Sequence, residues 1–437
     1  MADFLERPRG TEYFLTRALL LRSLGAIYAV AFVILIRQAQ PLLGSHGLLP
    51  LAAYMDFVLR HFDSQLGAVW RMPTLFWLGS SDALIEAGSW IGLMLATLVV
   101  CGVANAPILA ALWALYLSFV PAGQIFYGYG WDILLCEAGF LAVFLAPPWR
   151  PNLLSARDPP PLVVIVLFRW LTFRLMFGAG LIKIRGDACW TELTCLDFHY
   201  ETQPNPSPLS PYFHFAPHFT HTAGVLFNHL AELVAPFGVF GPRRVRHVAG
   251  LVIVGFQALL ILSGNLSFLN WLSIVIALAC FDDRLFARLA PARLRAELPR
   301  LRETALAPSR ARLVTLVALG IVIGFLSLNP IVNLLSPRQA MNASFDPFGL
   351  VNTYGAFGSV TRERHEVAIE GTVSPIPDES ADWREYEFPC KPGDVRRSPC
   401  LVTPYHYRLD WQLWFAGLSN LRREPWIMHL AYKLLEG

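Results

Sequence analysis

Long apolar runs recur through the first three quarters of this chain, and they restrict its fold more than any other feature. A helix needs about 20 apolar residues to cross the hydrocarbon core of a bilayer. Hydrophobic residues make up 55% of the chain and charged residues 15%, a balance typical of integral membrane proteins. We therefore predict an all-α polytopic membrane bundle with about nine spans. The predicted spans are 17–36, 84–103, 106–122, 131–148, 161–184, 222–240, 247–264, 266–281 and 313–335.

The placement of arginine predicts how this bundle is oriented. Short cytoplasmic loops retain positive charge, and the basic loop 282–312 carries eight arginines. Arg7, Arg9 and Arg17 fall on the same side under a nine-span count. The N-terminus is therefore expected in the cytoplasm and the chain after residue 335 outside it. A net charge of +3 is too small to predict nucleic-acid binding.

The segment 336–437 differs in kind from the rest, because most of it lacks membrane-length apolar runs. Alternating apolar and polar residues predict strands at 364–372, 384–389 and 405–415. We therefore expect a transmembrane domain at 1–335, followed by a small β-rich extracytoplasmic C-terminal domain at 336–437.

The extracytoplasmic loop 185–220, which follows the fifth predicted span, holds the densest group of reactive side chains. The functional residues predicted there are Arg185, Asp187, Cys189, Cys195, Asp197, His199 and Glu201. Cys189 and Cys195 favour a structural disulfide over an exchanging pair, because their spacing is not Cys-x-x-Cys. Cys390 and Cys400 flank turn-forming residues and are candidates for a second disulfide in an oxidising compartment.

Asp197, His199 and Glu201 alternate along a stretch that we predict to be extended. In a strand these three side chains would face one side and could form a metal or acid–base cluster. A proline-rich loop supplies no enforced geometry for such a cluster. We therefore predict loop hydrogen bonding and no metal site.

Charged residues also fall inside the predicted spans, where an unpaired charge costs at least a few kcal/mol. The predicted intramembrane polar network consists of Asp132, Glu137, Arg169, Arg174 and Glu232. With a rise of about 1.5 Å per residue, Arg174 and Glu232 lie at similar depths. This predicts an Arg174–Glu232 pair, with Glu137 as the competing partner. A network that fixes helix register is favoured over a proton or ligand path.

Four blocks of sequence together resemble the lipase maturation factors. They are 129–132 (Tyr-Gly-Trp-Asp) with 137–141, 178–204, 350–358, and 383–388 continuing through 405–415. The resemblance covers nearly the whole chain. It implies a polytopic protein of the endoplasmic reticulum membrane that helps secreted dimeric lipases reach their active fold, with a lumenal C-terminal domain that engages the client. In a bacterium the membrane would be the plasma membrane.

A shorter motif is similar to the vitamin K-dependent carboxylase group. It covers 177–190, Phe-Gly-Ala-Gly-Leu-Ile-Lys-Ile-Arg-Gly-Asp-Ala-Cys-Trp. In that group the lysine acts as a base on a reduced quinone, and the matching position here is Lys183. A partly desolvated lysine can serve as a base, but most lysines at span ends extend to the headgroups. The alternative function is therefore an intramembrane enzyme acting on a quinone or lipid, which a lipid-sized cavity beside Lys183 would favour.

Familiar enzyme motifs are absent from the sequence. It has no nucleophile-elbow Gly-x-Ser-x-Gly, no Walker phosphate loop and no His-Glu-x-x-His. A folding factor is therefore favoured over an enzyme, with no cofactor and with a secreted lipase-like client and membrane lipids as partners. The tail aromatics Trp383, Trp411, Trp414 and Phe415 are candidates for client contact, although each is more often ordinary core.

Overall fold

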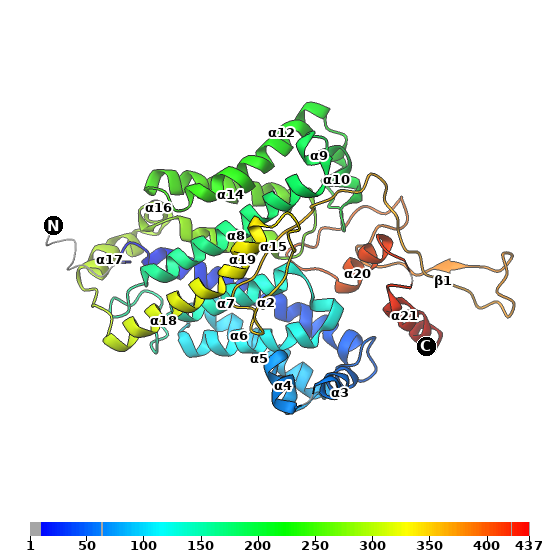
Figure 1. Ribbon diagram of the computed structural model, residues 1–437, viewed down its shortest axis with the longest axis horizontal. Helices are drawn as coiled ribbons and strands as arrows, with labels where there is room; N and C mark the ends of the chain where they lie inside the picture. The colour runs from blue at the N-terminus through cyan, green and yellow to red at the C-terminus, as the bar shows by residue number, and fades with distance from the viewer. Residues whose placement is uncertain (1–9, 63, 421, 437) are drawn as a thin grey trace.

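The computed structural model describes residues 10–62, 64–420 and 422–436 and shows a mostly helical protein (Figure 1). Arg7 and Arg9 lie outside the described residues. The α-helices up to residue 335, apart from short ones described below, are α2 (Phe14–Leu43), α3 (Leu51–His61), α4 (Gln65–Arg71), α5 (Asp82–Val100), α6 (Ala106–Ala122), α7 (Gly130–Leu145), α8 (Leu162–Gly186), α12 (His218–His229), α13 (Ala235–Gly238), α14 (Arg243–Ser263), α15 (Leu269–Ala277), α16 (Asp283–Leu289), α17 (Ala292–Glu303), α18 (Arg310–Leu326) and α19 (Leu328–Leu335).

Five helical segments among the described residues are long and apolar enough to cross a membrane. They are α2, α5, α8, α14 and the α18–α19 stretch Arg310–Leu335, while α6 and Leu269–Cys280 are apolar but shorter. Every predicted span coincides with helix, but the count of nine stays a prediction. The span predicted at 222–240 is divided into α12, a π-helical turn at Leu230–Val234 and α13. α7 has 16 residues, which is fewer than the roughly 20 that a full crossing needs.

α2 and α8 form the centre of the bundle. More than half of their apolar windows is buried, 56% and 61%, against 22% for Arg310–Leu335, which lies at the periphery. α2 also packs closely on α5, because Gly25 faces Val99 and a Cβ on Gly92 would overlap the ring of Phe32. Small residues at helix interfaces allow this approach in membranes.

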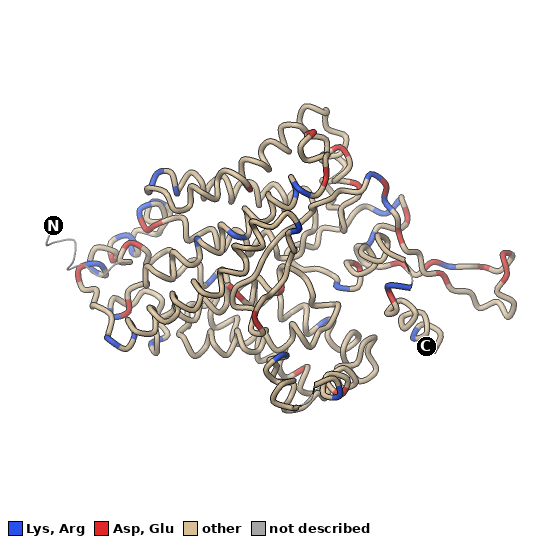
Figure 2. Tube along the Cα trace, viewed as in Figure 1, with Lys and Arg blue, Asp and Glu red and all other residues tan. Residues whose placement is uncertain are grey.

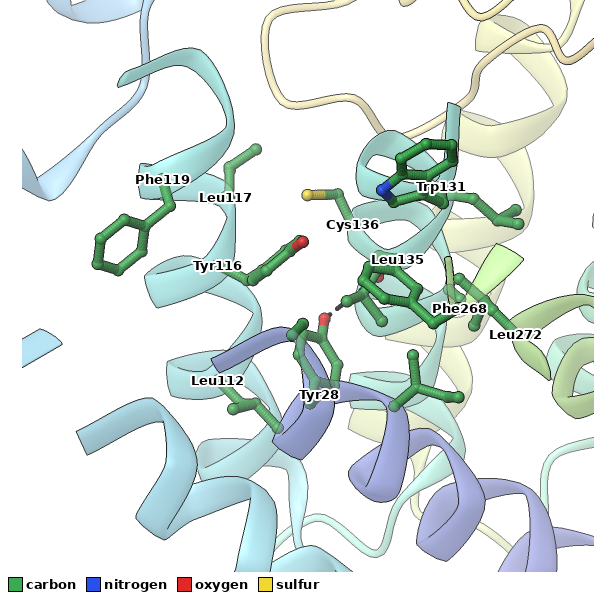
Figure 3. Packing of buried hydrophobic residues seen from close by; sticks show 14 of the residues in the cluster. Tyr28, Leu112, Tyr116, Leu117, Phe119, Trp131, Leu135, Cys136, Phe268 and Leu272 are labelled. Atoms are coloured by element: carbon green, nitrogen blue, oxygen red, sulfur yellow. Dashed lines mark hydrogen bonds between the residues drawn. The ribbon is translucent and has the colours of Figure 1, made fainter. Parts of the chain in front are cut away.

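Aromatic and aliphatic side chains from α2, α6, α7 and α15 fill the space between these helices (Figure 3). Tyr28 of α2 lies in the middle, and its hydroxyl donates a hydrogen bond to the carbonyl oxygen of Leu135 at 3.2 Å. The rings of Tyr28 and Tyr116 meet edge to face at 5.7 Å. A buried tyrosine needs such an acceptor for its hydroxyl, so this contact fixes the register of α2 against α7.

The basic loop 282–312 folds as α16 and α17 at the end of the molecule where the described chain begins (Figures 1 and 2). Asp283 caps the start of α2 by accepting hydrogen bonds from the backbone nitrogens of Phe14 and Leu15 at 3.0 and 2.8 Å. A carboxylate at a helix N-terminus is favourable because it satisfies free N–H groups. α20 and β1 of the tail lie toward the opposite end (Figure 1).

The tail is not β-rich, and this part of the sequence prediction was wrong. Its strands are β1 (Glu370–Gly371) and β2 (Arg384–Glu385), an antiparallel pair in which Glu370 lies opposite Glu385. The segment 405–415, predicted as a strand, instead contains most of α20 (Arg408–Gly417), and α21 (Pro425–Glu436) follows it. Aromatic residues favour strands locally, but tertiary packing overrides such preferences. Here Trp411 and Leu413 of α20 are buried in the main core.

Candidate functional site

The chain after α8 folds back on the bundle. It forms the short helices α9 (Ala188–Thr191), α10 (Leu196–Thr202) and α11 (Ser210–His214). Cys189 and Cys195 form a disulfide with a Cα–Cα distance of 4.8 Å, and both side chains are buried. The second expected disulfide, Cys390–Cys400, is also present. Burial of the first bridge favours a structural role, because exchange with a client needs an accessible sulfur.

Arg185 and Asp187 connect the end of α8 to the tail. Arg185 donates a hydrogen bond to the carbonyl oxygen of Ser336 at 3.1 Å. The carboxylate of Asp187 accepts from the backbone nitrogens of Cys189 at 3.0 Å and Val360 at 3.2 Å. Both side chains therefore hold backbone in place.

Asp197, His199 and Glu201 lie on α10, so the predicted extended stretch was wrong. At 3.6 residues per turn, Asp197 and Glu201 share one face and His199 lies on another. His199 is buried, whereas Glu201 is exposed and its Oε2 lies 3.6 Å from Nε2 of His214. The three residues therefore form no common cluster.

Asp197 faces two histidines at the start of α12. Its Oδ1 lies 2.7 Å from Nδ1 of His221 and 3.0 Å from Nδ1 of His218. Partial burial acts against ionisation, but the hydrogen bonds with His221 and then His218 hold the pKa of Asp197 below its ordinary value. Asp197 is therefore a carboxylate at neutral pH.

His199 is a neutral imidazole at neutral pH. Burial, and secondly the positive charge of Lys183, lower the pKa of His199 to about 4. Its ring packs edge to face against Phe357 at 4.9 Å. His199 therefore contributes an uncharged ring that packs against its neighbours and makes no charged contact.

Lys183 lies near the end of α8 with its ammonium group fully engaged. Nζ is 2.6 and 2.7 Å from the two carboxylate oxygens of Glu232 and 2.8 Å from Oδ1 of Asn228, and all three side chains are buried. The charge also lies 5.0 Å from the ring of Trp190. An ammonium has three donors and no acceptor. The two oxygens of Glu232 and the amide oxygen of Asn228 therefore supply an acceptor for each of these three donors.

The predicted Arg174–Glu232 pair does not form, and the competing partner Glu137 takes its place. Arg174 makes a buried ion pair with Glu137. Glu137 also accepts hydrogen bonds from the backbone nitrogen of Asn352 at 3.0 Å and from the hydroxyl of Tyr354 at 2.7 Å. Two residues of the tail therefore complete a charge site inside the bundle. Glu232 is instead placed beside Lys183 by the π-helical turn, a feature often found at functional sites.

Asp132 forms a second buried link to the tail. Its carboxylate pairs with Arg408 of α20 at 3.0 Å, and neither side chain is exposed. Tyr116 donates a further hydrogen bond to Asp132 at 2.5 Å. Arg169 lies apart and donates to the carbonyl oxygen of Ala279 at 2.9 Å. The expected single network is therefore several separate sites.

A cavity of about 390 Å³ opens beside Lys183, between the bundle and the tail. We call it the mouth cavity. Its polar wall is the Lys183–Glu232 pair with Asn228, and its apolar walls include Phe256 of α14 and Trp414 of α20. Such a cavity, mostly apolar with a few convergent polar groups, has the form of a small-molecule or side-chain binding site.

Two family models match the chain in order along its length. The lipase maturation factor transmembrane domain matches residues 15–288, and the lipase maturation factor C-terminal domain matches residues 350–437. The chain belongs to the lipase maturation factor family. Together with the five apolar helices, this membership indicates an integral membrane protein.

Relatives in this family match almost the whole chain. It is 49% identical to Lipase maturation factor 1 of Bos taurus, over 98% of this chain and 80% of that protein. It is 47% identical to Lipase maturation factor 1 of Mus musculus, over 100% of this chain and 79% of that protein. Lipase maturation factor 2 of Gallus gallus is 31% identical, over 96% of this chain and 72% of that protein. No solved structure is significantly similar to the chain.

Sequence reasoning missed the tail residues that enter the bundle, Asn352, Tyr354 and Arg408. All three lie in blocks that carry the resemblance to lipase maturation factors, 350–358 and 405–415. The intramembrane carboxylate of Asp132 was a further signal, because it had to face protein or water. Arg408 of the tail is its charged partner. Glu137 pairs with Arg174 inside the bundle, and the tail adds hydrogen bonds from Asn352 and Tyr354.

Proposed function

We propose that this protein is a membrane-anchored factor that assists the folding, assembly and maturation of secreted lipases. The observation that carries the proposal is the ordered match of both lipase maturation factor models along the chain. The membrane is that of the endoplasmic reticulum in a eukaryote or the plasma membrane in a bacterium. The N-terminus lies in the cytoplasm, and the client meets the tail on the opposite side.

The part of the tail best suited to meet a client is the hairpin that projects beyond α20 (Figure 1). β1 and β2 form its base, and Val373 and Ile376 lie beyond β1 with exposed fractions of 102% and 68%. Trp383 is also exposed there. Exposed apolar side chains beside a short strand edge can pair with an extended segment of another chain.

The other candidate aromatics contribute mainly to the molecule's own interior. Trp411 is buried, and Trp414 donates from Nε1 to the carbonyl oxygen of Thr202 at 3.0 Å. Phe415 is partly exposed and lines the mouth cavity. The hairpin is therefore the better target for an experiment than the whole tail, whose removal would also leave Asp132 buried without Arg408.

The test replaces Val373 and Ile376 together by serine and co-expresses the protein with a secreted lipase in cells that lack their own maturation factor. We expect secreted lipase activity to fall while the level of the variant stays normal. Val395→Ser is the matched control, because Val395 has an exposed fraction of 99% but lies outside the hairpin. Unchanged lipase activity with the hairpin variant would show that the hairpin is not the client contact. Unchanged lipase activity in cells without the protein would contradict the proposed function itself.

A second candidate function is an intramembrane enzyme acting on a quinone or lipid, with a reduced quinone as cofactor and Lys183 as general base. The mouth cavity beside Lys183 favours it, whereas the close contacts of Nζ with Glu232 act against a basic amine. The double variant Lys183→Met with Glu232→Leu separates chemistry from packing, because it removes both charges together. Turnover of an added quinol or lipid by the wild type that is lost in this variant at normal protein level would favour the enzyme, and no turnover by the wild type would exclude it.

A further inference from the structure

Three side chains with metal-binding groups meet where α10 packs against α12. Oδ1 of Asp197 lies close to Nδ1 of both His218 and His221, and the three ligand atoms lie within 4.8 Å of one another. The two histidines are three residues apart on one helix, so they project from the same face. Neither histidine belongs to the sequence segment that resembles the carboxylase group, and neither contributes to the mouth cavity.

The contact with Phe213 determines which nitrogen of His221 carries a hydrogen. Nε2 lies 2.8 Å from the carbonyl oxygen of Phe213, and a carbonyl oxygen only accepts hydrogen bonds, so Nε2 is the donor. In a neutral ring Nδ1 then carries a lone pair, and this lone pair points at the carboxylate of Asp197. Two acceptors 2.7 Å apart need a cation between them.

That cation is either a proton on the imidazole or a bound metal ion. His218 presents its own Nδ1 to the same carboxylate oxygen of Asp197, so two ring nitrogens converge on one oxygen. A carbonyl that holds the far nitrogen of His221 also matches the surroundings of metal-binding histidines, which donate their second N–H to a carbonyl or carboxylate.

We propose that Asp197, His218 and His221 bind a divalent transition-metal ion of the zinc class. Two imidazole nitrogens and one carboxylate oxygen form a common zinc ligand set, which leaves a fourth position for water. Zinc bonds of about 2.0–2.2 Å place tetrahedral ligand atoms roughly 3.3 Å apart. Binding would therefore widen the present separations of 2.7 and 3.0 Å by roughly 0.3–0.6 Å. It would also bring the two histidine nitrogens, which lie within 4.8 Å of each other, to the same spacing.

Such an ion would join two walls of the mouth cavity. Asp197 lies on α10 just after the Cys189–Cys195 disulfide, and His221 lies on α12, which also carries Asn228. The ring of His221 is buried, whereas 66% of the His218 side chain is exposed, so the ion can enter from solvent. Metal binding would thus stabilise the arrangement of α10 and α12 beside Lys183, in addition to any role in lipase maturation.

The test titrates zinc chloride into the full-length protein, purified in detergent and first stripped with a chelator. We expect saturable binding of about one zinc ion per chain above the level of the variants. Asp197→Asn and His221→Ala should each weaken this binding by at least about tenfold. His214→Ala is the matched control, because His214 lies in the same region but faces Glu201.

Cobalt substitution tests the metal site in the unmutated protein, so it does not depend on whether a variant folds. The unmutated protein loaded with Co²⁺ should show the intense visible absorption of tetrahedral nitrogen and oxygen ligands. Equal zinc binding by the wild type and Asp197→Asn, or only weak octahedral cobalt absorption, would overturn the proposal. In that case the three side chains form a hydrogen-bonded cluster that binds no metal ion.

Discussion

Arg408 is fully buried, and its carboxylate partner among the described residues is Asp132. Arg408→Met removes one charge and leaves the other buried without a partner. Loss of one member of a buried pair costs about 3–5 kcal/mol. We expect the free energy of unfolding to fall by that amount, measured by urea denaturation in detergent. Arg384→Met is the control, because Arg384 pairs with Asp382 at the surface with an exposed fraction of 83%.

The double variant Asp132→Leu with Arg408→Met tests whether the loss comes from the unpaired charge. It removes both charges, so it should recover much of the stability lost in Arg408→Met. A double variant as unstable as the single one would contradict this account and would indicate that the shape of the pair, rather than its charge, holds α20 on α7.

His199 predicts a pH dependence of stability. Burial, together with the charge of Lys183, lowers its pKa from the ordinary 6.5 to about 4. As the pH falls, His199 is therefore protonated first in the unfolded chain, which favours unfolding. The contribution of His199 to the free energy of unfolding is full above pH 6.5, decreases toward pH 4 and levels off below it. The slope between these limits is at most about 1.4 kcal/mol per pH unit.

His199→Phe should flatten the part of the stability curve between these two pH values, measured as melting temperature against pH. The buried His406, whose pKa is also lowered by burial and by Arg408, keeps some of the slope. His365→Phe is the control, because the His365 side chain is 72% exposed. An equally steep curve in His199→Phe would show that His199 is not the titrating group.

Residue pairs were predictable from the sequence only where both partners lie in the bundle. The depth argument named Glu137 as the competing partner of Arg174, and this pair forms. Depth did not predict Lys183 beside Glu232, because the π-helical turn alters the positions that follow α12. The third charge site depends on Arg408, which is distant in sequence from Asp132.

At the scale of elements, the Cys189–Cys195 disulfide holds α9 and α10 together. It closes a short loop with a sequence separation of 6, and the entropy of so short a loop corresponds to about 2 kcal/mol. Replacing both cysteines by serine should lower the melting temperature while lipase maturation at permissive temperature is retained. Cys101→Ser is the control, because Cys101 is a free, exposed cysteine. Lost maturation at normal stability would instead indicate exchange with the client.

Helices were far more predictable than the elements of the tail. Apolar runs of membrane length coincide with helices, because the bilayer leaves the backbone few alternatives. In the tail the local sequence pattern does not decide between strand and helix. The segment 405–415 alternates like a strand, but its Trp411 and Leu413 pack into the core as part of α20. α10 was likewise predicted as extended, although the helix brings Asp197 to His221.

At the scale of the whole molecule, the tail and the bundle share their interior. Asn352 and Tyr354 complete the Glu137 site, and Trp414 lines the mouth cavity. A boundary at residue 335 therefore divides the chain into two segments of different composition, but the two segments pack together as one interior. Under the proposed function, a client bound to the tail would be coupled through α20 to the cavity beside Lys183.

The two ends of the molecule should lie on opposite sides of the membrane. The arginine-rich helices α16 and α17 lie at one end and the hairpin lies toward the other (Figures 1 and 2), and positive loops stay in the cytoplasm. Asp378→Asn creates the glycosylation sequence Asn-Glu-Ser near the tip of the hairpin. In eukaryotic cells we expect one additional glycan relative to the parent chain, detected by a mobility shift that an endoglycosidase reverses. The double variant Arg288→Asn with Ala290→Thr places such a signal in the last turn of α16 and should gain no glycan, whereas a glycan there would reverse the proposed orientation.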